Sequence, residues 1–161
     1  KDIKKIIIRA MPKEWDDFIP PSDEELEIIK KQLVPLADPD LIYIARTKDG
    51  KPIGFNISIP DYNQVLDKMK GSLFPTGIFK FLYYKRKIDR IRFFVLFVVP
   101  DYRNKGVSSA IYLNSYLAAQ RKGYKFVEGS TIWKYNEPMI LDIEKCGGTR
   151  YKTYRIYKKE I

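Results

Sequence analysis

The junction between an apolar run at residues 91–99 and the segment after it constrains the fold most. The run is apolar on both faces, which is typical of a central strand covered from both sides. After a turn at residues 100–104, apolar residues recur at helical spacing until Gly123, which predicts a helix. A buried strand that leads straight into a helix is typical of α/β folds.

Hydrophobic periodicity predicts the other elements. We expect strands at residues 3–9, 41–46, 52–59, 124–132 and 149–158, although the Tyr spacing of three in the last segment would also suit a helix. Residues 41–59 form a hairpin around Gly50. Ser22 and Glu25 have capping-box spacing before a helix, and further helices are expected at residues 64–70, 78–84 and 136–145. This order predicts a mixed α/β (α+β) sheet with helices on both faces.

Composition excludes several chemistries within this chain of 161 residues. There is no His, which rules out Ser-His-Asp and Cys-His machinery and His-ligated metal. Cys146 is the single cysteine, so we expect no disulfide and no metal site, and we interpret it as a small buried side chain rather than a nucleophile. No apolar run approaches the roughly 20 residues of a membrane span. We therefore expect one cytoplasmic domain over residues 1–161, with no signal peptide and no membrane partner.

The formal net charge of +10 favours a polyanionic partner, such as nucleic acid, anionic lipid or a phosphorylated small molecule. A helix that begins after a Gly-containing turn offers unpaired N–H groups to an anion. Gly106 allows close approach, Arg103 and Lys105 add positive charge, and Ser108 and Ser109 can donate hydrogen bonds. The junction therefore fits a phosphate or pyrophosphate site, and it also fits an ordinary strand–helix turn with surface cations. Walker and dinucleotide GxGxxG patterns are absent.

Residues 98–108, Val-Val-Pro-Asp-Tyr-Arg-Asn-Lys-Gly-Val-Ser, resemble the acyl-CoA loop of the GNAT superfamily of N-acyltransferases. The signature of that loop is Arg/Gln-x-x-Gly-x-Gly/Ala after a hydrophobic strand. Arg103 and Gly106 match it, and Ser108 stands where Gly or Ala is usual. Downstream, Asn136 at the start of a helix and the glycines that close it resemble the same family. The resemblance implies a mostly antiparallel central sheet with a splayed central strand pair, and residues 60–90 as an inserted segment on the acceptor side.

The resemblance also implies an activity. It is transfer of an acyl group, most often acetyl, from acetyl-CoA or another acyl-CoA to a primary amine of a small molecule. A base deprotonates the amine, which attacks the thioester, and an acid protonates the departing thiolate. The implied cofactor contacts are the backbone of the strand end, the loop with the first helical turn, and the Asn-led helix: Phe97, Val98, Arg103, Asn104, Lys105, Gly106, Val107, Ser108, Ser109 and Asn136.

Candidate catalytic groups are fewer. Glu128 lies mid-strand, where a carboxylate is out of place unless it faces a cavity, so it is the candidate base; alternatively it is a structural carboxylate bound to a neighbouring Arg or Lys. Family members commonly take the acid from a Tyr seven residues after the Asn, and that position is Ile143 here. Tyr135 or Tyr116 could replace it, although either could simply be packing. The acceptor pocket would include Asp61, Tyr62, Asn63 and Ser130, of which the first three also fit a capped turn.

Two other functions remain open. The chain could be a non-catalytic CoA-binding module that keeps the loop and lacks the acid. It could also be a nucleic-acid binder, because the basic residues at 85–87, Arg90 and Arg92 lie near Tyr83 and Tyr84. The aromatic segment at residues 74–84 could cover the acceptor site or form a homodimer face.

Overall fold

The computed structural model describes residues 2–11, 21–157 and 159. Two compact units are distinguished, residues 1–128 and 129–161. The first unit holds α1 (Asp2–Ala10), α2 (Asp23–Leu33), η1 (Pro39–Leu41), β1 (Ile42–Arg46), β2 (Pro52–Pro60), α3 (Asn63–Met69), α4 (Thr76–Lys85), β3 (Arg90–Val98), η2 (Pro100–Tyr102), α5 (Val107–Arg121) and most of β4 (Phe126–Gly129). In the second unit, α6 (Glu137–Lys145) is the helix among the described residues.

The four strands form one sheet in the order β1-β2-β3-β4, and its first three strands are antiparallel. Phe55 of β2 pairs with Ile44 on one side and Phe97 on the other. β4 follows β3 through the crossover helix α5 and adds a parallel edge. The predicted mixed and mostly antiparallel sheet is confirmed, and so is the hairpin around Gly50, whose φ is +80°.

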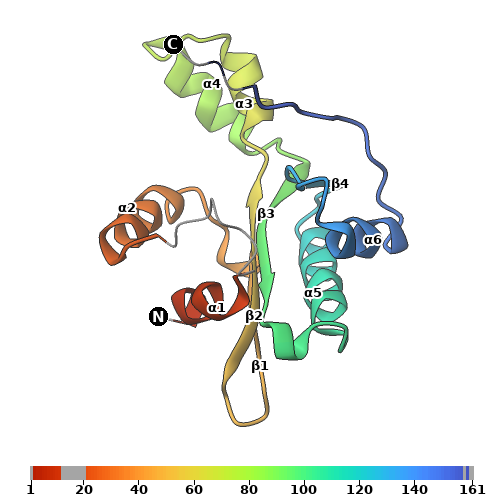
Figure 1. The fold of residues 1–161 in the computed structure, drawn as a ribbon. Coiled ribbons are helices and arrows are strands. Elements are labelled where there is room, and N and C mark those ends of the chain that lie inside the picture. The colour runs from red at the N-terminus through yellow and green to blue at the C-terminus, as the bar shows by residue number, and fades with distance from the viewer. Residues whose placement is uncertain (1, 12–20, 158, 160–161) are drawn as a thin grey trace. The chain divides into compact units, whose positions relative to one another are not determined.

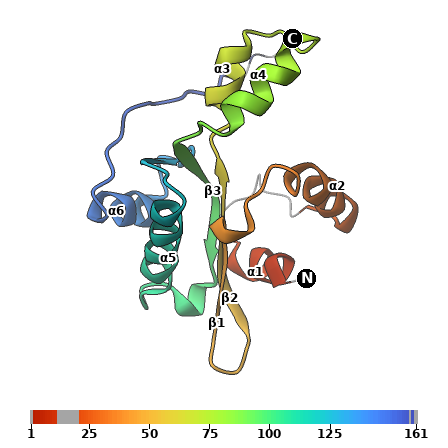
Figure 2. The same ribbon diagram turned by 180° about the vertical axis from the view of Figure 1, so that it is seen from behind.

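Helices cover both faces of the sheet, as predicted (Figures 1 and 2). On one face, Ile6 and Ala10 of α1 pack with Phe55 and Val99 in a fully buried cluster. On the other face, Ala118 and Ala119 of α5 pack with Leu41 and Ile91. Through these two clusters β3 is packed between α1 and α5. The end of this strand leads into the candidate site, so its position is set by packing on both faces.

The segment at residues 3–9 is a helix, so the predicted first strand was wrong. Ile3, Ile6, Ile7 and Ala10 recur every three or four residues, and all four contact the same buried cluster. A strand would have pointed alternate residues to opposite faces. The run Ile6-Ile7-Ile8 suggested β structure because of its β-branched side chains, but the helical period decides the packing, and Ile8 is left 57% exposed.

Three further predictions met mixed outcomes. The capping box before α2 is confirmed, because Ser22 Oγ accepts from the Glu25 N–H and the Glu25 carboxylate accepts from the Ser22 N–H. The strand predicted at residues 124–132 is shorter and ends at Gly129, a residue type that weakens strands. Cys146 is exposed, so its interpretation as a buried side chain was wrong: it follows the last turn of α6, which buries no residue.

No strand forms at residues 149–157, so the predicted last strand was wrong over its described part; Lys158 lies outside the described residues. The Tyr- and Thr-rich composition favours a strand only when a neighbouring strand supplies hydrogen bonds and packing. Here residues 149–157 are exposed throughout, and Ile156 is fully so.

Candidate functional site

The junction between β3 and α5 has the backbone of an anion cradle. Asn104 and Gly106 have positive φ angles of 55° and 76°, which turn the chain sharply into α5. Gly106 is the N-cap residue and no side chain caps the helix; the first helical bond runs from the Ala110 N–H to the Gly106 carbonyl at 2.9 Å. As in any α-helix, the N–H groups of the first turn have no acceptor within the helix. The junction can therefore offer several amide donors to one anion.

Two glycines shape this cradle. A Cβ placed on Gly106 would meet nothing within 4 Å, so the space in front of the turn is open. A Cβ on Gly54 of β2 would lie 3.2 Å from the Phe97 carbonyl and 3.3 Å from Val107 Cγ1. Gly54 thus lets the first turn of α5 pack close to the sheet. Sequence reasoning missed Gly54; a lone glycine inside a strand pattern was its signal, because such a residue marks close approach.

The Arg103 side chain links the loop to two backbone carbonyl groups. Its Nε donates to the Val98 carbonyl at 3.1 Å, and its Nη2 donates to the Ala10 carbonyl at 2.7 Å, at the end of α1. The guanidinium therefore ties the end of β3 to α1. Arg103 and Lys105 are both exposed, and the Lys105 Nζ lies 5.5 Å from the Tyr102 ring centroid. That Arg103 contacts a bound anion directly stays a prediction.

The end of β3 extends beyond its neighbour β4. The N–H groups of Lys125 and Phe126 donate to the Asp89 carbonyl at 2.7 and 3.2 Å, so β4 joins at the start of β3. β4 has four residues and β3 has nine, so the parallel neighbour flanks only the first part of β3. Phe97 and Val98 lie past it. The Val99 N–H bonds to the Ile53 carbonyl at 2.9 Å, so by the alternation of an antiparallel pair Phe97 bonds to β2 and Val98 presents its backbone to the open edge. The arrangement accords with the predicted splayed strand pair.

Glu128 lies in a cluster of alternating charges, which we call the carboxylate–arginine cluster: Asp61, Arg90, Arg92 and Glu128. Glu128 Oε2 is 3.7 Å from an Arg90 nitrogen, and Oε1 is 3.7 Å from an Arg92 nitrogen. Arg90 is also 3.9 Å from Asp61 Oδ2. The Glu128 side chain is only 16% exposed, and buried carboxylates are stabilised when they are paired.

The cluster matches the structural alternative for Glu128 without excluding proton transfer. Both ion pairs have N···O distances of 3.7 Å, which is longer than a hydrogen bond. The lone pairs of the carboxylate are therefore not used in hydrogen bonds to these arginines. Within residues 21–128, neither oxygen of Glu128 accepts a hydrogen bond. Sequence reasoning placed Arg90 and Arg92 in a basic patch and missed them as partners of Glu128. Their period-two spacing on β3 was the available signal.

The predicted acceptor residues of the first unit form a turn at the start of α3. Asp61 is 3% exposed, and its Oδ1 accepts from the Asn63 N–H at 3.3 Å. Tyr62 donates to the Leu36 carbonyl at 3.3 Å and stacks on Phe81. The capped-turn alternative therefore accounts for their local contacts. Asp61 also joins the carboxylate–arginine cluster, which links this turn to Glu128 through Arg90.

Three predicted site residues belong to the second unit. Tyr135 is 63% exposed and makes an edge contact with Trp133 at 5.0 Å. Asn136 precedes α6 as its N-cap residue, as predicted, although its side chain caps nothing. Ser130 Oγ is buried and has no hydrogen-bond partner among the described residues. Tyr116, the other candidate acid, lies in α5 of the first unit and is 54% exposed. The catalytic role of Tyr135, the cofactor contact of Asn136 and the acceptor contact of Ser130 stay predictions.

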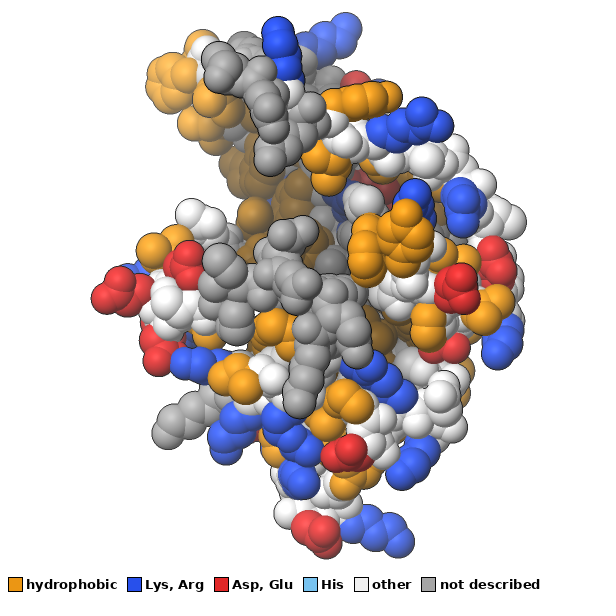
Figure 3. Space-filling model, viewed as in Figure 1, with side chains coloured by type: hydrophobic (Ala, Val, Ile, Leu, Met, Phe, Trp, Pro, Cys, Tyr) orange, Lys and Arg blue, Asp and Glu red, His pale blue; other side chains and the backbone are white. Residues whose placement is uncertain are grey.

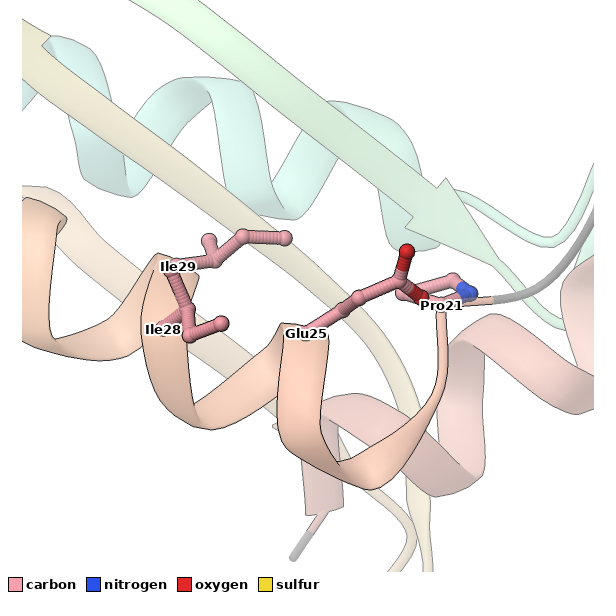
Figure 4. Close-up of a pocket in the computed structure, with 4 residues that line it drawn as sticks. All are labelled: Pro21, Glu25, Ile28 and Ile29. Atoms are coloured by element: carbon pink, nitrogen blue, oxygen red, sulfur yellow. The ribbon is translucent and has the colours of Figure 1, made fainter.

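Two surface pockets lie away from the junction. One has a volume of about 320 Å³ and is lined by Glu25, Ile28 and Ile29 of α2 and by Pro21, which precedes this helix (Figure 4). It is mostly apolar and contains no cation, so it does not suit a diphosphate. The other, of about 240 Å³, lies between the loop before β1, Tyr62 and Tyr124. Burial raises the pKa of the Tyr124 phenol there.

Neither a metal-binding cluster nor a membrane-spanning helix is found among residues 2–11, 21–157 and 159. Within these ranges no group of three His, Cys, Asp or Glu side chains could hold a metal ion. No helix in the same ranges has the length and apolar character needed to cross a bilayer.

Comparison with curated proteins finds two relatives. The chain is 30% identical over 151 residues to Protein YghO of Escherichia coli (strain K12), covering 89% of this chain and 38% of that protein. It is 28% identical over 157 residues to bacterial ceramide synthase of Caulobacter vibrioides, covering 91% of this chain and 40% of that protein. The chain thus spans about 40% of the length of the curated relatives it matches. No family model matches the sequence.

Comparison with solved structures finds the same fold in acetyltransferases. The aminoglycoside acetyltransferase AAC(6')-Iy, in complex with a CoA bisubstrate analogue, matches with a TM-score of 0.61 at 17% identity, over 99% of this chain and 90% of that one. AAC(6')-Ih from Acinetobacter baumannii matches with a TM-score of 0.59 at 15% identity, over 98% and 90%. Chaetomium thermophilum Naa20, in complex with a bisubstrate analogue, matches with a TM-score of 0.56 at 15% identity, over 88% of this chain and 64% of that one.

Proposed function

Because the chain has the fold of the GNAT acyltransferases, we propose that it transfers an acyl group from acyl-CoA to a primary amine. The observation that carries the proposal is the uncapped first turn of α5, which opens onto empty space at Gly106 directly after the end of β3. This is where the resemblance to the acyl-CoA loop places the diphosphate of the coenzyme. The fold and the loop sequence both support the proposal.

Each part of the first unit has a role in this proposal. The amide groups at the start of α5 hold the diphosphate, and Lys105 adds a positive charge. Arg103 keeps the loop in shape through the Val98 and Ala10 carbonyls. The open edge of β3 at Val98 pairs with the extended arm of the coenzyme. Bound acyl-CoA would supply a thioester: as the amine nitrogen bonds to the acyl carbon, the C–S bond would break, and CoA would leave as a thiolate that takes a proton from an acid, for which Tyr135 is the candidate.

Glu128 is the proposed acceptor of the amine proton. Its two arginine neighbours, each 3.7 Å from one of its oxygens, balance the charge of this largely buried side chain. A proton taken from the amine would leave Glu128 neutral beside Arg90 and Arg92. Asp61 shares Arg90 and would retain a counter-charge for it.

Two classes of acceptor are compatible with the proposal. One is a small polar amine, which accords with the aminoglycoside acetyltransferases that share the fold. The other is a long-chain amine, because one relative is named a ceramide synthase and a ceramide is the amide of a long-chain amino alcohol. The long apolar side chains exposed on α4 favour the second class.

Amine-dependent release of free thiol from acyl-CoA tests the proposal. Acetyl-CoA and palmitoyl-CoA would each be incubated with an aminoglycoside, a polyamine and sphinganine, and the amide product identified by mass. We expect thiol release that requires both the chain and one amine class. If acyl-CoA raises the melting temperature but no amine in the panel releases thiol, the chain is instead a CoA-binding module.

The nucleic-acid alternative is weakened by the carboxylate–arginine cluster. Arg90 and Arg92, which that alternative needs for phosphate contacts, are directed to Asp61 and Glu128. Lys87 lies over one face of the Tyr83 ring at 4.3 Å and donates to its hydroxyl, so that face is occupied by a cation.

A further inference from the structure

The outer face of the α3–α4 hairpin carries a band of exposed apolar side chains. We call it the α4 patch. Figure 3 shows hydrophobic side chains gathered over the part of the molecule where Figure 1 draws α4. All members are about half exposed or more: Leu73 (73%), Phe74 (80%), Ile78 (49%), Phe79 (73%), Leu82 (58%) and Tyr83 (57%). Contiguous exposed apolar surface of this kind is typical of an interaction site.

The α4 patch does not result from a helix that is misoriented about its axis, because the opposite face of α4 is already packed. Gly77 is buried, and a Cβ there would lie 2.0 Å from the Ser72 carbonyl oxygen. The Phe81 ring stacks on Tyr62 at 6.0 Å, and α3 buries Val65 and Met69. Rotating α4 to bury the patch would expose this inner face. The helix is therefore apolar on two sides, and only one is used within the first unit.

The segment that carries the patch is rich in basic residues. Residues 66–87 contain one acidic side chain, Asp67, which pairs with Lys68 at 3.7 Å. The other basic residues of this segment flank the patch at both ends or lie on α4: Lys70, Lys80, Lys85, Arg86 and Lys87. The segment therefore combines exposed aliphatic and aromatic side chains with several basic ones. This combination is complementary to a bilayer that carries anionic headgroups.

We propose that the α4 patch docks the protein on the surface of an anionic lipid bilayer. Leu73, Phe74 and Phe79 would enter the boundary between headgroups and acyl chains, and the lysines would lie at the phosphates. No membrane partner was expected from the sequence, because no segment spans a bilayer, but a peripheral contact needs no span. The inference goes beyond the acyl-transfer proposal and does not depend on it.

Two other occupants fit the surface less well. In a two-fold dimer the same patch would face itself, which would bring Lys80, Lys85 and Arg86 against their own copies. A nucleic acid would use the cations, but the aliphatic Leu73, Ile78 and Leu82 offer no ring for a base to stack on. The bilayer satisfies both the apolar side chains and the cations.

Vesicle flotation tests the proposal. We expect the protein to float with vesicles of phosphatidylcholine and phosphatidylglycerol, to bind pure phosphatidylcholine more weakly, and to lose the difference at high salt. The double variant Phe79→Ser/Leu82→Ser should bind anionic vesicles at least about tenfold more weakly, because less apolar surface is buried. Leu113→Ser on α5 is the matched control: Leu113 is 57% exposed, and its change should leave binding unaltered.

A charge pair completes the design. Lys85→Gln/Arg86→Gln should weaken binding to anionic vesicles and leave binding to neutral ones unchanged, whereas Lys48→Gln/Lys51→Gln, in the β1–β2 turn, should alter neither. The proposal is overturned if wild type does not float, or if the patch variant and Leu113→Ser bind equally. It is also overturned if sedimentation without vesicles shows a dimer that the patch variant abolishes.

Discussion

Gly106→Glu is expected to weaken acyl-CoA binding at least about 100-fold, because a fixed carboxylate would stand among the amide donors meant for the diphosphate. The space before Gly106 is open, so the new side chain has room and need not disturb the fold through a clash. Its effect would act through charge repulsion and occupation of the cradle. Isothermal calorimetry with CoA measures it.

Gly50→Glu is the matched control for this variant. Gly50 has a φ of +80° against +76° for Gly106, and a Cβ on either residue meets nothing within 4 Å. The two substitutions therefore impose the same backbone strain and the same charge, one at the cradle and one in the β1–β2 turn. Gly50→Glu should lower the melting temperature similarly and keep CoA affinity. Equal affinities for the two variants would count against the cradle.

Glu128→Gln is expected to lower kcat about 100-fold or more while CoA affinity stays within about twofold of wild type. The amide keeps the shape of the side chain and removes its ability to take a proton from the amine. The change also leaves Arg90 and Arg92 without a counter-charge from this residue, so some loss of stability is expected. Rates should be measured well below the melting temperature of the variant.

Asp38→Asn separates catalysis from stability. The Asp38 side chain is 20% exposed and forms an ion pair with Lys122 at 2.7 Å. Like Glu128, whose side chain is 16% exposed, it is therefore a largely buried carboxylate paired with a cation. The ion pairs of Lys122 with Asp38 and Asp40 raise the pKa of the lysine above its ordinary value. Asp38→Asn should therefore lower the melting temperature and leave kcat unaltered. If Glu128→Gln behaves the same way, Glu128 is a structural carboxylate only.

The central part of the fold could be predicted because local signals there agree. The run on β3 is apolar on both faces, and a Gly-containing turn and a helical period follow it; the structure has β3, the turn and α5 in that order. The capping box at Ser22 and the turn at Gly50 depend only on near neighbours, and both are confirmed. Structural features that depend on residues close together in the chain can therefore be predicted from the sequence.

The ends of the chain were mispredicted because tertiary contacts decide them. Residues 3–9 have strong β propensity, but their three-to-four spacing meets the buried cluster around Phe55. The last segment has β-favouring residues and forms no strand over its described part. In the site, the sequence indicated the cradle and Glu128, but the partners of Arg103 and Glu128 depend on contacts across the sheet. Ala10 lies 93 residues from Arg103, a separation that no local pattern spans.

Calorimetric titration of the wild-type chain with CoA, beside pantetheine, is the most direct test of the cradle. Pantetheine lacks the diphosphate and keeps the arm that would pair with β3. We predict saturable binding of one CoA per chain, with pantetheine at least about 100-fold weaker. The absence of saturable CoA binding, or equal affinities for the two ligands, would contradict the account.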